Sequence, residues 1–418
     1  MSKTNSNILN KAKQKKVFVG LSGGVDSAVS AGLLKEAGFY VTGVFIKAWQ
    51  ADFLPCNWRE ERRDAMKVAI ALDIPFLSLD LGEEYKKEVV DKIVEEYKVG
   101  RTPNPDVLCN REVKFGVFWK KAKELGADYI ATGHYAQIGK KNPDELVSST
   151  KGQGGKLATD TNSSGFLESG DELVLSSESQ GGKLENSDSF QMLEGRDKSK
   201  DQSYFLWTLT QDDLAHTLFP IGHLEKSEVR KLADKFGLPV AEKKDSQGIC
   251  FLGDISMDEF LSHFIETKKG DVLNISGEVI GTHDGALYYT MGERRGFDIT
   301  KKDSNSKAFY VVSKDMKANT ITVSNVEREI KELSPKKVLL KDVNWINRPQ
   351  LGKSLVARMR YRGERLPVVV KENSGAWEVE FSEPVRGLSF GQSIVFYQGE
   401  ECLGGAIMDK EVIISKHE

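Results

Sequence analysis

A glycine-rich turn between an expected strand and an expected helix constrains the fold of this chain more than any other feature. The turn reads GLSGGVDS over residues 20–27. The apolar run 17–19 is typical of a short strand, and 28–37 of a helix that ends at Gly38. Such a turn leaves backbone N–H groups unpaired at the positive end of the helix dipole. The sequence therefore predicts an anion-binding turn, without the lysine of the GxxxxGKS/T loop.

Strand-like and helix-like runs alternate through the first third of the chain. The strand-like runs are 40–46, 75–81 and 128–132, and the helical runs are 59–72, 84–97 and 114–125. This order predicts a parallel sheet wrapped by helices, with ligands at the carboxyl ends of the strands. Residues 22–24 and 133–134 both follow expected strands, so we expect them at the same edge.

Residues 141–190 interrupt this rhythm with a serine- and glycine-rich segment. The stretch 144–157 recurs at 171–184 with ten of fourteen positions matching. This pattern predicts a duplicated, mostly disordered insertion whose two DELV pieces could pair as a hairpin.

Later segments change from helical to strand-like patterns. A helical pattern covers 211–236, strands begin near 270, and alternating strands from 336 onward predict a small antiparallel barrel. The expected organisation is a flexible tail at 1–16, an α/β domain at 17–245, a central domain at 246–333 and a β-barrel domain at 334–418.

Composition excludes several classes of protein. The 418 residues suffice for two or three domains, and no apolar run approaches the about 18 residues that a membrane span needs. Four cysteines without a CxxC motif argue against a disulfide framework or a protein zinc site, and fit a reducing cytoplasm. The net charge of −3 does not indicate nucleic-acid binding, so such a role must rest on local patches.

Two cysteines lie in segments that suggest chemistry. Cys109 follows Pro103 and Pro105, which predict an extended segment and exclude a helix, and Asp106 could act as a general acid or base beside it. Cys250 follows two lysines that would favour its thiolate. Cys56 and Cys402 are interpreted as packed small side chains.

The motifs as a set resemble one family. The turn resembles the SGGxDS pyrophosphate loop of ATP pyrophosphatases. Together with GRTPNPDVLCN, ATGHYA, KDQSYFLWTL, KKDSQGICF, RMRYRGE and CLGGAI, it makes nearly the whole chain similar to the bacterial tRNA-specific 2-thiouridylases. The resemblance implies an α/β PP-loop domain, a central domain and a C-terminal β-barrel. The implied enzyme is a tRNA-uridine 2-sulfurtransferase that replaces the C2 oxygen of the wobble uridine with sulfur.

The resemblance also implies a mechanism. ATP with Mg²⁺ adenylates the uridine oxygen, and a persulfide on Cys250 then supplies sulfur. Cys109 releases that sulfur by freeing hydrosulfide or by forming a disulfide with Cys250, and Asp106 is the implied acid or base.

Binding residues follow from the same resemblance. The implied ATP contacts are Gly20, Leu21, Ser22, Gly23, Gly24, Val25, Asp26, Ser27, Ile46 and Gly133. The implied tRNA contacts are Asn104, Pro105, Asp106, His134, Lys200, Asp201, Gln202, Arg360, Tyr361 and Gln392. The implied partners are tRNA and a sulfur donor such as a cysteine desulfurase or a sulfur-relay protein. We expect a cytoplasmic monomer with no membrane contact.

Independently, Arg358, Arg360 and Arg362 alternate along an expected strand, which predicts a basic stripe facing phosphates.

Three alternatives remain open at this point. The chain could be an amidating ligase that uses the same ATP loop, or a thiolase in which Asp106, Cys109 and Cys250 hold an iron–sulfur cluster. It could also bind tRNA without catalysis.

Overall fold

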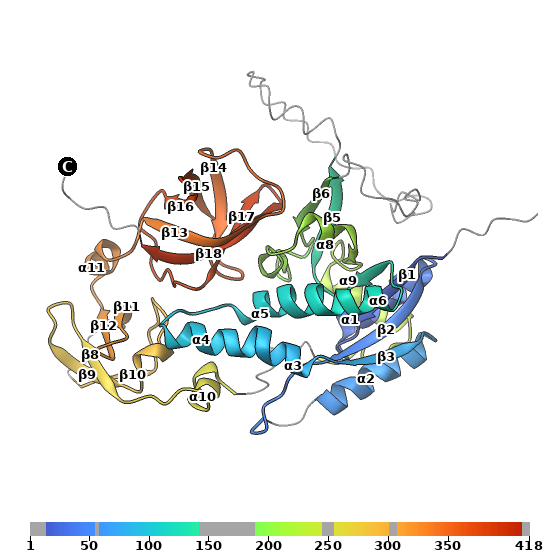
Figure 1. Ribbon diagram of the computed structural model, residues 1–418, viewed down its shortest axis with the longest axis horizontal. Coiled ribbons are helices and arrows are strands. Elements are labelled where there is room, and N and C mark those ends of the chain that lie inside the picture. Colours follow the sequence, from blue (N-terminus) through green and yellow to red (C-terminus); the bar gives the residue numbers. More distant parts are fainter. Residues whose placement is uncertain (1–13, 55–57, 142–188, 245–254, 301–306, 412–418) are drawn as a thin grey trace, which may run out of the picture.

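The computed structural model describes residues 14–54, 58–141, 189–244, 255–300 and 307–411. These residues form a parallel-sheet domain, a central β domain and a C-terminal barrel, which lie beside one another in Figure 1. The expected repeat at 144–157 and 171–184 lies outside the described residues, as does most of the expected tail.

The first sheet has five parallel strands in the order β3-β2-β1-β4-β7. The strands are β1 (Lys16–Gly20), β2 (Tyr40–Lys47), β3 (Phe76–Asp80), β4 (Tyr129–Ala131) and β7 (Thr217–Leu218). The alternation of strand-like and helical runs therefore predicted the sheet correctly.

Helices cover both faces of this sheet. Val17 and Val19 of β1 are fully buried against one group of helices, whereas Phe18 packs on the opposite face. The first face carries α1 (Val25–Glu36), α2 (Trp58–Ala71) and α9 (Lys226–Lys235). The second carries α3 (Gly82–Tyr85), η1 (Lys86–Asp91), α4 (Lys92–Lys98), α5 (Pro105–Leu108), η2 (Cys109–Val117) and α6 (Phe118–Glu124). Helix α1 ends as expected, because Gly38 adopts a φ of 85° just beyond it.

The prediction of an extended, non-helical segment around Cys109 was wrong. The chain is helical from Pro105 through α5, η2 and α6, so Asp106 and Cys109 lie on a helix. Asn104 caps this helix, with its side-chain oxygen accepting from the N–H groups of Asp106 (3.1 Å) and Val107 (3.3 Å). Proline is favoured at the first helical position, where its missing N–H would have no partner and its φ is already helical.

The helical pattern over 211–236 is also divided. It contains α8 (Gln211–Ala215), the short strand β7 and α9. The interruption contains Pro220 and Gly222, and both residue types disfavour a continuing helix.

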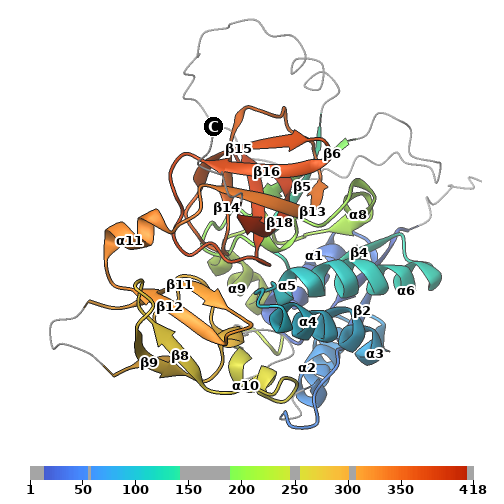
Figure 2. The ribbon, with the colours of Figure 1, turned by 60° about the vertical axis from the view of Figure 1, so that its left-hand side comes forward.

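The central domain is built on a second sheet with the order β10-β9-β8-β12-β11. Its elements are α10 (Met257–Ser262), β8 (Gly270–Leu273), β9 (Val279–His283), η4 (Ala286–Tyr288), β10 (Phe297–Ile299), β11 (Tyr310–Asp315), β12 (Thr320–Ser324) and α11 (Glu327–Glu332). Figure 2 shows α11 where the chain passes from this sheet to the barrel.

The C-terminal barrel closes because β13 pairs with both β16 and β18. Its six antiparallel strands are β13 (Lys337–Trp345), β14 (Ser354–Arg358), β15 (Leu366–Asn373), β16 (Ala376–Phe381), β17 (Ser393–Gln398) and β18 (Glu401–Glu411). The expected barrel is therefore present.

A hairpin from the first domain continues the barrel sheet. Strands β5 (Ala136–Lys141) and β6 (Ser189–Glu194) pair with one another, and β6 pairs with β18 at Cys402 and Glu401. The segment η3 (Ser203–Phe205) follows this hairpin. This pairing fixes the orientation of the barrel relative to the loop that contains residues 200–202.

Candidate active site

The glycine-rich turn joins β1 to α1 and is held by its own serines. The Ser22 N–H donates to Ser27 Oγ (3.2 Å), and that hydroxyl donates to the Gly24 carbonyl (3.2 Å). Leu21 and Val25 are buried in the domain core while Ser22 is exposed, so the turn is held by the core and has one side open to solvent. Gly23 has a φ of 74°, and a Cβ there would lie 2.7 Å from the Glu61 carbonyl oxygen of α2. Only glycine fits this position without movement of α2.

Gly133 brings the end of β4 against the same turn. A Cβ on Gly133 would lie 2.6 Å from the Ser27 nitrogen and 2.7 Å from the Asp26 carbonyl carbon. Ile46 is half-buried near the carboxyl end of β2, the strand next to β1. The expectation that these segments share one edge of the sheet is thus confirmed.

Asp26 is the meeting point of three distant segments. The Lys226 ammonium lies 2.7 Å and 2.8 Å from its two carboxylate oxygens, and the Tyr135 hydroxyl donates to it at 2.8 Å. Sequence reasoning missed both partners. Tyr135 lay within the quoted ATGHYA string, but nothing local marked Lys226, which is 200 positions from Asp26.

Cys109 and Asp106 lie one helical turn apart near the start of the helix that Asn104 caps. Cys109 is only 4% exposed. Burial raises the pKa of the Asp106 carboxyl, and the positive charge of Lys114 partly opposes this shift. A carboxyl whose pKa is raised toward neutrality is better suited to donating and accepting protons.

The barrel holds the segment before this helix. The Gln392 side-chain amide donates to the carbonyls of Thr102 (2.9 Å) and Pro103 (3.2 Å), and the Thr102 N–H donates to Phe390 (2.9 Å). Gln392 therefore contacts protein backbone in this structure, at the entry to the segment that contains Asn104 and Pro105.

His134 follows Gly133 in the chain and contacts Phe115 of η2, the helical segment that begins at Cys109. Its Nδ1 is 2.7 Å from Thr132 Oγ1, and its ring packs against Phe115 and Phe219. Burial lowers the pKa of His134 well below its usual value, and the charge of Lys114 adds to the effect. The imidazole is therefore neutral at physiological pH.

The predicted basic stripe is wrong, because the three arginines do not share a solvent-facing strand. Strand β14 ends at Arg358, and Arg362 has a φ of 57° in the following turn. Arg358 points inward and pairs with Glu194 (3.1 Å) and Asp201 (2.9 Å), whose side chains are 1% and 2% exposed. The strand-like sequence pattern continued past the strand's actual end.

The residues expected to contact tRNA fall into two groups. Asp201 is fully engaged, since it also accepts from Gly195, Ser203 N–H and the Ser203 hydroxyl. Gln202 exchanges hydrogen bonds with the Tyr135 backbone. Lys200, Arg360 and Tyr361 keep part or most of their surface exposed.

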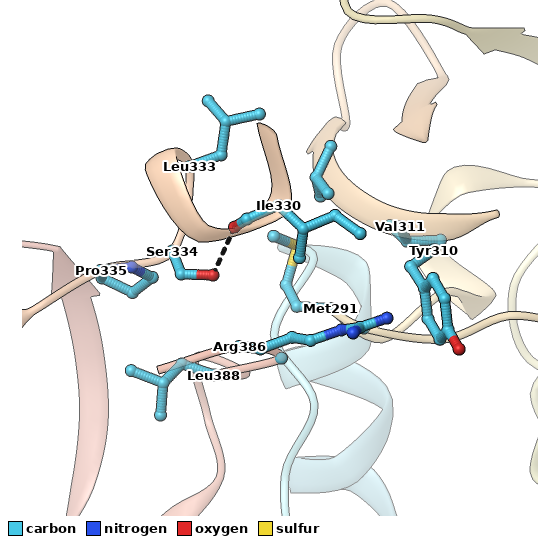
Figure 3. Close-up of a pocket in the computed structure, with 12 residues that line it drawn as sticks. Met291, Tyr310, Val311, Ile330, Leu333, Ser334, Pro335, Arg386 and Leu388 are labelled. Carbon is cyan, nitrogen blue, oxygen red and sulfur yellow. Dashed lines mark hydrogen bonds between the residues drawn. The ribbon is translucent and has the colours of Figure 1, made fainter. Parts of the chain in front are cut away.

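Arg360 also connects two domains. Its guanidinium donates to the carbonyls of Gly387 (2.8 Å) in the barrel and Met291 (3.4 Å) in the central domain. Beside it lies the pocket in Figure 3, where Arg386 stacks 3.7 Å from the ring centroid of Tyr310. None of the predicted site residues lines this pocket, which lies where the two domains meet.

Cys250 and Cys56 lie outside the described residues. Lys243, near the end of the described range 189–244, pairs with Asp64 (2.8 Å), and Asp64 adjoins Gly23. Cys402 is fully buried and burial raises the pKa of its thiol, which agrees with a packing role. Among the residues that the structure describes, no cluster of three or more His, Cys, Asp or Glu side chains could hold a metal ion. Within the same ranges, no helix is long and apolar enough to cross a membrane.

The fold is an α/β parallel-sheet domain, with a glycine-rich turn at the carboxyl ends of its strands, followed by two β domains. Family models match in the same order: "tRNA methyl transferase HUP domain" at 15–159 and 172–254, "tRNA methyl transferase PRC-barrel domain" at 258–325, and "Aminomethyltransferase beta-barrel domain" at 335–408.

Relatives identify the family. The tRNA-specific 2-thiouridylase MnmA of Listeria welshimeri is 39% identical over 414 residues, covering 98% of this chain and 96% of the relative. The Enterococcus faecalis protein of the same name is 39% identical over 401 residues, covering 94% and 95%. The chain therefore belongs to the tRNA-specific 2-thiouridylase MnmA family.

Solved structures are more distant. The U34-tRNA thiolase NcsA of Methanococcus maripaludis is 18% identical with a TM-score of 0.32, covering 60% of this chain and 66% of that one. NMN synthetase of Francisella tularensis is 15% identical with a TM-score of 0.29, covering 59% and 71%.

Proposed function

We propose that this protein catalyses ATP-dependent 2-thiolation of the wobble uridine of tRNA, giving 2-thiouridine, AMP and pyrophosphate. One observation carries the proposal: the chain aligns with a tRNA-specific 2-thiouridylase over 98% of its length, with 39% of the aligned residues identical. It is supported by an anion-binding turn and a helix with Asp106 and Cys109 in one domain.

The turn is the proposed ATP site. Residues 20–27 would bind the phosphates through backbone N–H groups and the two serine hydroxyls, with Gly133 beside them and Ile46 at the adenine. The Asp26 carboxylate is 31% exposed, and its oxygens are the donor type that Mg²⁺ prefers. The described residues thus fit ATP with Mg²⁺, whose charge would offset that of the phosphates.

Cys109 and Asp106 are the proposed catalytic residues in the described part of the chain, and Cys250 is the proposed persulfide carrier. ATP turns the uridine O2 into a leaving group that departs as AMP. The terminal persulfide sulfur forms the new C2–S bond. In one route Cys109 attacks the inner sulfur of Cys250 and frees hydrosulfide, which then displaces AMP at C2. In the other, the persulfide itself displaces AMP, and Cys109 then attacks the Cys250 sulfur, breaking the S–S bond and releasing the 2-thiolated base. Both routes end in a Cys109–Cys250 disulfide that an external reductant reopens. Asp106 would act as the general acid or base beside Cys109.

A hollow near residues 200–202 is lined by Lys198, Ser199, Asp201, Arg358 and Arg362. Arg358 is paired there with Asp201, so the hollow itself carries little net charge. We propose that Lys200, Arg360 and Tyr361 contact tRNA directly. Asn104, Pro105 and Asp106 would face the target base, with His134 nearby, while Asp201, Gln202 and Gln392 would hold those segments in place.

We propose a cytoplasmic monomer that receives sulfur from a cysteine desulfurase or a sulfur-relay protein. We also propose that 17–245, 246–333 and 334–418 are its functional units.

The test is thiolation in vitro. Protein, ATP, Mg²⁺, a sulfide source and unmodified tRNA are incubated, and the digested RNA is searched for 2-thiouridine by mass. Wild type and Cys402→Ala should make it, whereas Cys109→Ser and Cys250→Ser should not. Pyrophosphate release without a thiolated base would refute the proposed acceptor and favour an amidating ligase. Visible absorbance in anaerobically purified protein would favour the iron–sulfur mechanism.

A further inference from the structure

The proposed ATP loop has no positively charged side chain of its own to offset the negative charge of the phosphates. Residues 20–27 contain no lysine or arginine and include Asp26. A carboxylate beside a polyphosphate raises the free energy of binding through like-charge repulsion. The positive helix end offsets part of this, but it amounts to only about half a charge.

Lys226 places a full positive charge at this carboxylate. Its ammonium lies 2.7 Å and 2.8 Å from the two Asp26 oxygens, and its side chain is only 15% exposed. The ammonium is therefore shielded from solvent, whereas the Asp26 carboxylate, which is 31% exposed, stays accessible to a ligand.

The surrounding structure fixes Lys226 at this position. It is the first residue of α9, and its backbone N–H donates to Asp197 (3.1 Å). Helix α9 packs beside α1, and the Tyr135 ring lies 5.8 Å from the Lys226 ammonium. The Tyr135 hydroxyl donates to the same Asp26 carboxylate, so Tyr135 and Lys226 meet at the start of α1.

We propose that Lys226 is a pyrophosphate-binding residue of this enzyme. In the ligand-free protein its ammonium is paired with Asp26. When ATP binds, the flexible stem lets the ammonium exchange one carboxylate oxygen for an oxygen of the β- or γ-phosphate, and Asp26 turns toward the metal. Lys226 thus has the role that a lysine within the turn has in GxxxxGKS/T loops. This inference rests on the proposed function, because it takes ATP as the ligand of the turn.

The proposal predicts which part of the nucleotide depends on Lys226. The ammonium lies at the turn and α1, where the phosphates would bind, whereas the proposed adenine contact, Ile46, is on β2. Loss of Lys226 should therefore weaken pyrophosphate binding and leave AMP binding nearly unchanged. A residue that only stabilised the fold would affect both ligands alike.

The experiment is isothermal titration of the full chain with inorganic pyrophosphate and, separately, with AMP, both with Mg²⁺. Lys226→Met should weaken pyrophosphate binding about tenfold to a hundredfold, as expected for a lost charge-assisted hydrogen bond. AMP affinity should change less than about twofold, which is below 0.5 kcal/mol. Lys226→Arg should recover most of the loss.

The matched control is Lys235→Met on the same helix. Lys235 pairs with Glu36 at 3.0 Å and its side chain is 61% exposed. This variant should bind both ligands as wild type does. If Lys226→Met does not fold, Lys226→Gln is measured instead, since it keeps a hydrogen-bond donor and removes only the charge.

Two results would overturn the inference. Unchanged pyrophosphate affinity in the variant would show that the lysine does not contact this ligand, and equal losses for AMP and pyrophosphate would show a structural role. The proposed function fails separately: if wild type binds pyrophosphate but makes no 2-thiouridine, the acceptor is wrong and Lys226 keeps its role. Wild type that binds neither ATP nor pyrophosphate refutes both.

Discussion

Replacing Arg358 by Met tests whether this arginine supports the structure or contacts RNA. The change removes the guanidinium and keeps an unbranched apolar stem. It leaves Glu194 and Asp201 buried without the cation that lies 3.1 Å and 2.9 Å from them.

The expected loss in the free energy of unfolding depends on the partners that Glu194 and Asp201 keep. Removing one partner of a buried ion pair costs about 3–5 kcal/mol. Glu194 keeps Arg365 and Lys198 as partners, and Asp201 keeps its hydrogen bonds from Gly195 and Ser203. We therefore expect the lower end, about 3 kcal/mol, which corresponds to a fall in Tm of about 12–24 °C for a domain the size of the barrel.

The assay combines thermal unfolding with tRNA binding at several salt concentrations. A phosphate contact would lower the slope of log affinity against log salt by about one when removed. Arg358→Met should leave that slope unchanged at temperatures where the variant is folded. Arg328→Met is the control, since Arg328 is 84% exposed and its ion pair with Glu332 is worth at most about 1 kcal/mol. An unchanged Tm with a reduced slope would refute the structural interpretation and restore the sequence-based one.

Three further predictions concern the site. Because burial holds the pKa of His134 below its usual 6.5, the unfolded chain binds a proton there that the folded protein does not, so stability present above that value is lost as pH falls. Wild type should lose stability between about pH 6.5 and pH 5.5 that His134→Gln retains, measured by urea unfolding; parallel curves would contradict this. Gly133→Ala places a Cβ 2.6 Å from the Ser27 nitrogen, so it should cost about 1–3 kcal/mol of stability and weaken ATP binding in titration calorimetry, and normal ATP affinity would argue against the close approach. Gln392→Ala removes two hydrogen bonds to the segment before Asn104, so the thiolation kcat should fall with ATP affinity unchanged; a raised KM for tRNA alone would indicate direct contact instead.

The local sequence carried much of the fold. The alternation of apolar runs was sufficient for the parallel sheet, since the periods of strands and helices are properties of neighbouring residues. The turn at 20–27 was recognisable for the same reason. The Ser27 hydroxyl donates to Gly24 within the turn, and Gly23 leaves room for the Glu61 carbonyl of α2.

Prediction from the local sequence was wrong where the same residues are compatible with two local structures. Pro105 was interpreted as excluding a helix, but proline is equally compatible with a first helical position, and the Asn104 side chain decided between the two. The alternation of Arg358, Arg360 and Arg362 fitted a strand, although the strand ends at Arg358.

The sequence by itself determined the parallel sheet of the first domain, the C-terminal antiparallel barrel, the position of the glycine-rich turn and the kinds of side chain available for chemistry. Only the tertiary structure decided which charges meet. Lys226 reaches Asp26 across 200 positions, and Arg358 reaches Asp201 across 157. Such pairs form because packing of helices and strands brings their backbones together and excludes water from the contact. Residue spacing along the chain carries no record of that packing.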